Sequence, residues 1–124
     1  MKSRWLSVSL LALVLGISLV AISCKKSTSP GSGGVPDITI GISGQNGSNS
    51  FFPNPDTVTV GQKVAWHNAD GITHTATANG IGGFDTGNIG PARTSGAIQM
   101  NTTGSFAYHC TIHTSMTGTL VVRP

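Results

Sequence analysis

From Val35 to the end of the chain, apolar and polar residues alternate along short segments, and no stretch has the apolar spacing of an amphipathic helix. The strand candidates are residues 37–42, 57–60, 63–68, 73–78, 95–100, 105–110 and 117–122. Stretches rich in Gly, Pro, Asn and Ser separate them, which is typical of turns between strands. About seven short strands with such turns predict an antiparallel β-sandwich or barrel.

The start of the chain has a different pattern. A basic stretch that contains Lys2 and Arg4 precedes a mostly apolar run over residues 6–22, and small residues then lead to Cys24. This order is typical of an export signal, and the cysteine at its end resembles a bacterial lipoprotein signal. We therefore predict a lipoprotein signal peptide over residues 1–23. An ordinary cleaved signal and an uncleaved membrane span are the alternatives.

Lipidation of Cys24 would anchor the exported protein to a membrane, facing the periplasm or the cell exterior. Residues 24–34 contain Lys, Ser, Thr, Pro and Gly and no large apolar side chain, so they predict a flexible Gly/Ser tether. Residues 35–124 then form the one folded domain. A chain of about 90 residues is near the lower end of what folds alone comfortably.

The charge of the chain gives little indication of a partner. The formal net charge is +3 over all 124 residues, but three basic and four acidic residues leave the part from Val35 onward at −1. A basic patch for nucleic acid is therefore not expected. A disulfide between Cys24 and Cys110 is not expected either, because one cysteine ends the leader and the other lies within the domain. We expect a monomer.

Residues 108–116 read Tyr-His-Cys-Thr-Ile-His-Thr-Ser-Met and hold three donors close together in sequence. Cys110 supplies a thiol, His113 an imidazole and Met116 a thioether. This set suits a soft, redox-active metal better than a hard cation. A fourth donor must come from another part of the chain.

Strand parity selects the fourth donor among the remaining histidines. His109 adjoins Cys110, so in an extended strand its side chain points to the opposite face. His67 follows the inward Trp66 and points outward for the same reason. His74 stands at a turn that enters the next strand, and it is the best candidate. Two His, one Cys and one Met match the His2Cys site with a long axial thioether.

The chain resembles the cupredoxins, in particular the plastocyanin and amicyanin group of blue copper proteins. The matching motifs are Phe52-x-x-Pro-x-x-x-Thr-Val60, Gly61-x-x-Val-x-Trp-x-Asn-x-Asp70, His74-Thr75, Phe84-Asp-Thr-Gly87 and Gly104-x-Phe-x-Tyr-x-Cys-x-x-His-x-x-Met116. They cover most of residues 38–122. The resemblance implies an all-β, Greek-key antiparallel β-sandwich of the cupredoxin type.

The resemblance also implies a site and a function. His74, Cys110 and His113 would be the equatorial ligands of one copper ion, and Met116 the axial ligand. The protein would be a one-electron carrier that cycles between Cu(I) and Cu(II), with redox proteins as its partners, and not an enzyme. Many members of the family have Asn after the first His, where this chain has Thr75, so the hydrogen bonding of the sulfur is open.

Two other functions are compatible with the sequence. A copper storage or delivery protein would use the same four ligands. A metal-free β-sandwich interaction module would instead use His74 and Met116 for packing only. For any one of these residues taken alone, packing is the commoner role, and their combination is what favours a metal.

Overall fold

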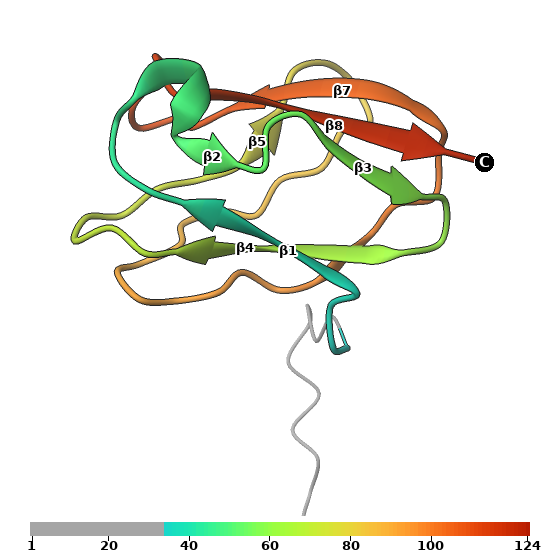
Figure 1. Ribbon diagram of the computed structural model, residues 1–124, viewed down its shortest axis with the longest axis horizontal. Coiled ribbons are helices and arrows are strands. Elements are labelled where there is room, and N and C mark those ends of the chain that lie inside the picture. The colour runs from blue at the N-terminus through green and yellow to red at the C-terminus, as the bar shows by residue number, and fades with distance from the viewer. Residues whose placement is uncertain (1–33) are drawn as a thin grey trace, which may run out of the picture.

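A computed structural model describes residues 34–124 of the protein (Figure 1). The described elements are β1 (Ile38–Ile42), the 3-10 helix η1 (Gly47–Asn49), β2 (Phe51–Phe52), β3 (Asp56–Thr59), β4 (Lys63–Asn68), β5 (Thr77–Ala78), β6 (Ile98–Gln99), β7 (Gly104–His109) and β8 (Thr117–Arg123). The predicted signal peptide, Cys24 and all but the last residue of the predicted tether lie outside the described residues. Between residues 34 and 124 there is no helix with the length and apolar character that crossing a bilayer requires.

The strands form two four-stranded sheets, which confirms the predicted β-sandwich (Figure 1). One sheet has the order β2-β1-β4-β6 and the other β3-β8-β7-β5. The sheets differ from the prediction in one respect. Each is mixed, because β1 pairs in parallel with β4 and β3 pairs in parallel with β8. Alternation along a strand shows which side chains share a face but carries no information on the direction of the neighbouring strand.

Two predicted strands are much shorter than their sequence pattern. Only Thr77–Ala78 of residues 73–78 and Ile98–Gln99 of residues 95–100 are strands. The connection after β5 folds back along residues 74–77 and pairs with them at the isolated bridges His74↔Ile89 and Thr77↔Asp85. His74 therefore lies in a loop that is held by backbone pairing and does not lie inside a regular strand.

The core between the sheets is built around aromatic rings. Trp66 stacks on Phe84 with ring centroids 4.9 Å apart, and Phe51 meets Tyr108 edge-on at 4.7 Å. Trp66 and Cys110 are buried, as strand parity predicted, and Val64 and Tyr108 on the same faces are buried as well. The whole buried cluster lies between Ile40 and Val122, so residues 34–124 contain a complete core and we expect this range to fold on its own.

The two ends of the sandwich have different roles. Asp37 directly precedes β1 and lies beside Lys63, the first residue of β4. The N–H of Asp37 donates to the Lys63 carbonyl at 2.8 Å. The parallel pair of strands then runs to Ile42 and Asn68. The described chain therefore enters the sheet at one end through residues 34–37, and the loop that leads to His74 leaves from the other end (Figure 1).

A buried glycine tests how tightly the sandwich is packed. Gly118 on β8 lies opposite Tyr108 on β7, and a Cβ at this position would lie 2.3 Å from Cζ of that ring. We expect Gly118→Ala to lower the free energy of unfolding of residues 34–124 by about 1–3 kcal/mol, as overpacking does. Urea unfolding measures the difference.

The matched control is Gly71→Ala, because no atom lies within 4 Å of the added Cβ. This change should stay within about 0.5 kcal/mol of the parent. Equal stability of the two variants would contradict the packing of Tyr108 over Gly118.

Candidate metal centre

Three donor atoms converge at the end of the sandwich that lies opposite the N-terminal entry. Sγ of Cys110 is 3.9 Å from Nδ1 of His74 and 3.9 Å from Nδ1 of His113, and the two nitrogens are 3.2 Å apart. We call these residues the His–Cys–His cluster. Atoms held at about 2.0–2.3 Å from one shared ion have separations of this size. Among the His, Cys, Asp and Glu residues that the structure describes, these three are the ones grouped closely enough to hold a metal ion.

Backbone pairing places each side chain of the cluster. His74 is held by two hydrogen bonds with Ile89, N–H to carbonyl at 3.1 Å and the reverse at 2.7 Å. Cys110 directly follows β7. The turn after it closes through the N–H of Cys110 to the Met116 carbonyl at 3.1 Å, and the N–H of Met116 to the His113 carbonyl at 2.9 Å. A single short turn thus positions both Cys110 and His113.

Met116, the predicted fourth donor, is fully buried and belongs to the same buried cluster as Cys110. Its position is fixed where the turn returns to β8. Its role as the axial ligand stays a prediction. The set of one thiolate, two imidazoles and a neighbouring thioether fits a single copper ion, because soft sulfur donors select such metals.

The other two histidines lie outside the cluster. Nδ1 of His109 is hydrogen-bonded to Oδ1 of Asn79 at 2.5 Å, and Nδ1 of His67 is hydrogen-bonded to Oγ1 of Thr94 at 2.9 Å. Both side chains are on the outer faces of the sheets, as strand parity predicted. Neither competes for the metal.

Hydrogen bonds to its sulfur shape the acidity of Cys110. Burial raises the pKa of the thiol, but N–H groups of Thr75, His113 and Ile112 and the side chain of His74 stabilise the thiolate and lower the pKa from 9.0 to about 6. The N–H of Thr75 donates to Sγ at 3.3 Å. At neutral pH the sulfur is therefore mainly in the thiolate form, which is the form that binds metal.

Thr75 answers the question that the sequence left open. Its backbone supplies the donor to the sulfur, although its side chain is not the expected Asn. Its Oγ1 accepts the N–H of Thr111 at 2.8 Å and lies 3.1 Å from the Thr111 hydroxyl, and the Thr77 hydroxyl donates to it at 3.3 Å. Thr75 therefore ties the segment of His74 to the segment of Cys110.

Asp70 is a residue of the site whose role the sequence did not indicate. Its Oδ2 lies 2.9 Å from Nε2 of His74, the nitrogen that faces away from the cluster. The hydrogen bond with His74 and that from the Gly71 N–H hold the pKa of this carboxyl below its usual value. The signal in the sequence was a carboxylate four residues before a candidate ligand, which is too common a spacing to interpret alone.

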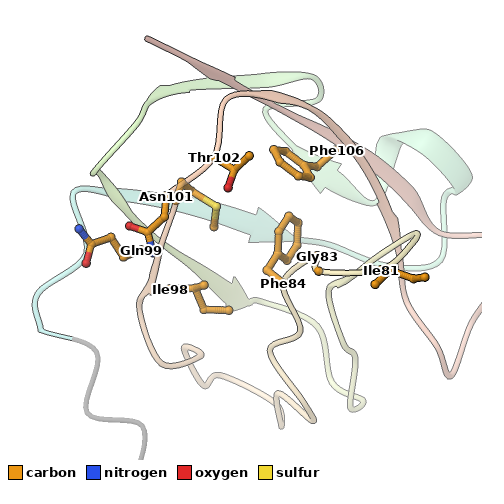
Figure 2. Close-up of a pocket in the computed structure, with 10 residues that line it drawn as sticks. Ile81, Gly83, Phe84, Ile98, Gln99, Asn101, Thr102 and Phe106 are labelled. Atoms are coloured by element: carbon orange, nitrogen blue, oxygen red, sulfur yellow. The ribbon is translucent and has the colours of Figure 1, made fainter.

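A cavity of about 570 Å³ lies elsewhere, at the edge of the sandwich (Figure 2). Phe84, Ile98 and Phe106 line it together with the Gly-rich residues 81–83 and the segment 99–102. None of its lining residues is a His, Cys, Asp or Glu. It is therefore not an alternative metal centre.

Comparison with known proteins identifies the fold. No family model and no curated protein matches the chain. Among solved structures, a purple cupredoxin from Nitrosopumilus maritimus is 22% identical with a TM-score of 0.61, and the match covers 69% of this chain and 99% of that one. A reduced Cu(I) form of an amicyanin variant is also 22% identical, with a TM-score of 0.59 and coverage of 69% and 81%. The fold is cupredoxin-like.

A third match is to a much longer chain. A copper-containing nitrite reductase from Thermus scotoductus SA-01 is 26% identical with a TM-score of 0.62. The match covers 73% of this chain but only 23% of the reductase. The cupredoxin-like fold of this chain thus corresponds to about a quarter of that enzyme.

The acidity of Cys110 can be measured in the copper-free domain. We expect the ultraviolet absorbance of the thiolate in residues 34–124 to titrate with a midpoint of about 6. Because the folded pKa lies below the unfolded pKa, the thiolate contributes fully to stability above about pH 9. This contribution falls as the pH is lowered and is lost below about 6. Cys110→Ser, the control, should show neither effect, and a midpoint near 9 would contradict the hydrogen bonding described.

Proposed function

We propose that the protein is a type 1 copper protein that carries single electrons, with His74, Cys110, His113 and Met116 as ligands. The observation that carries the proposal is the His–Cys–His cluster, whose donor atoms lie within 4.8 Å of one another at one end of a cupredoxin-like fold. Copper, when bound, supplies a one-electron couple between Cu(I) and Cu(II).

The residues of the site suit electron transfer better than a reaction on a substrate. Four donors from this chain fill the coordination that such a site needs and leave no position for a substrate. His74 and Cys110 are fully buried, whereas His113 is only partly buried. His113 is therefore the part of the site nearest to a partner, and the buried donors are held by the rigid sandwich. We propose a carrier and not an enzyme, although the nitrite reductase shares the fold.

The sequence and the fold together support a membrane-anchored carrier. The predicted lipoprotein signal would anchor the protein at Cys24, outside the cytoplasm. The chain enters the domain at the start of β1, and the His–Cys–His cluster lies at the other end of the sandwich. Two exposed apolar residues are close to the proposed ligands in sequence: Ile72 lies two residues before His74, and Ile112 directly precedes His113. We propose that this monomer presents the end with His113 to redox proteins, away from the membrane.

Copper storage or delivery is the second candidate function. It is favoured by the partial exposure of His113, because a ligand that is open to solvent can be exchanged during transfer of the ion. The metal-free module is disfavoured, because packing alone gives no reason for two imidazole nitrogens to lie 3.2 Å apart beside a buried thiol.

Reconstitution with Cu(II) tests the proposed site. Residues 34–124 should bind one equivalent with an intense blue visible absorption, and Cys110→Ser should lose this absorption because the thiolate is its source. His109→Ala is the matched control and should keep the colour, since His109 bonds to Asn79 outside the cluster. A colourless complex of the parent, or an intense blue that persists in Cys110→Ser, would refute the proposal.

A separate measurement distinguishes carrier from donor. We expect fast and reversible reduction of the copper-loaded protein without loss of copper. Voltammetry measures the reduction, and metal analysis of the same sample measures the copper that remains bound. Ready transfer of Cu(I) to a copper-free acceptor protein, with slow or irreversible reduction, would instead assign the protein to copper delivery.

A further inference from the structure

Asp70 and His74 form a hydrogen bond on the side of the His74 ring that faces away from the metal site. Oδ2 of Asp70 lies 2.9 Å from Nε2 of His74, whose ring is fully buried. A carboxylate can only accept a hydrogen bond, so Nε2 must carry the proton. The lone pair of Nδ1 is then left facing Cys110 and His113.

The loop between β4 and His74 is built to hold Asp70 in this position. Asn68 is fully buried, and its Nδ2 donates to the Ile72 carbonyl at 2.7 Å and the Ile89 carbonyl at 2.9 Å. Its Oδ1 accepts the N–H of Asp70 at 2.9 Å. The other carboxylate oxygen of Asp70 accepts the N–H of Gly71 at 2.7 Å. Both carboxylate oxygens of Asp70 therefore take part in hydrogen bonds, and these hold Oδ2 against Nε2 of His74.

We propose that Asp70 is a positioning residue that fixes the tautomer of His74 and tunes the copper site in favour of Cu(II). The inference rests on the proposed copper function. A ligand His whose second nitrogen donates to a carboxylate is oriented and made more basic by it. The negative charge also favours the more highly charged ion, and it is only partly screened because the Asp70 side chain is 27% exposed.

Two substitutions separate the hydrogen bond from the charge. Asp70→Asn keeps an oxygen that can accept from Nε2 but removes the negative charge. Asp70→Ala removes both. Asp37→Asn is the matched control, because it removes the same charge at the far end of β1, next to Lys63.

The tautomer is measured by nitrogen NMR on copper-free residues 34–124, at a pH where the histidines are neutral. We expect His74 to carry its proton on Nε2 in the parent, in Asp70→Asn and in the control. In Asp70→Ala the tautomer should shift toward a mixture. A parent protein with the proton on Nδ1, or an unchanged tautomer in Asp70→Ala, would overturn the positioning role.

The effect of the Asp70 charge on the site is measured through the affinity for copper and the reduction potential. We expect both Asp70 variants to bind Cu(II) about 10- to 100-fold more weakly than the parent, with a smaller effect on Cu(I). The reduction potential should rise by about 59 mV for each tenfold change in the ratio of the two affinities. The Asp37→Asn control should match the parent.

The outcomes distinguish the two proposals. If the parent binds copper through Cys110 but both Asp70 variants keep its affinity and potential, the tuning role of Asp70 is refuted and the copper function stands. If the parent does not bind copper, the proposed function fails, and the tautomer measurement still decides whether Asp70 positions His74.

Discussion

The hydrogen bond from the N–H of Thr75 to the sulfur of Cys110 joins two segments that lie 35 residues apart. One segment supplies His74 and the other supplies Cys110 and His113, so the site exists only when they are held together. The side chain of Thr75 strengthens this link through Thr111. The same bond helps to keep the buried sulfur ionised. This one contact thus contributes both to the positioning of the clustered residues and to the ionisation of the sulfur.

The polar end of the sandwich is supported by an apolar interior. Thiolate, imidazole and amide groups are costly to bury unless each finds a partner, and here buried Asn68 and Thr75 have theirs. The stacked rings of Trp66 and Phe84 and the edge-on contact of Phe51 with Tyr108 fill the space behind them. A rigid interior keeps donor atoms at fixed separations. This suits an ion that changes its charge with little rearrangement.

The fold alone does not decide the function. Solved structures that share it include both a small cupredoxin and a nitrite reductase about a quarter of whose length is matched. Unrelated activities commonly share a fold, so function must be argued from the site. In this chain the donor set and the partial exposure of His113 are the features that support the proposed function. The entry of the chain into β1 and the His–Cys–His cluster lie at opposite ends of the sandwich.

The sequence by itself determined most of the strands, their inward faces and the identity of the clustered residues. Alternation is a local property, so the parity of Trp66 and Cys110 could be read along the chain, and it placed His67 and His109 outside the site. Tertiary structure decided what depends on contacts between distant segments. The parallel pairings, the shortening of β5 and β6, the hydrogen bond from Thr75 to the sulfur and the hydrogen bond between Asp70 and His74 are of this kind. None of them leaves a periodic signal, because each depends on where a loop comes to lie once the two sheets have packed.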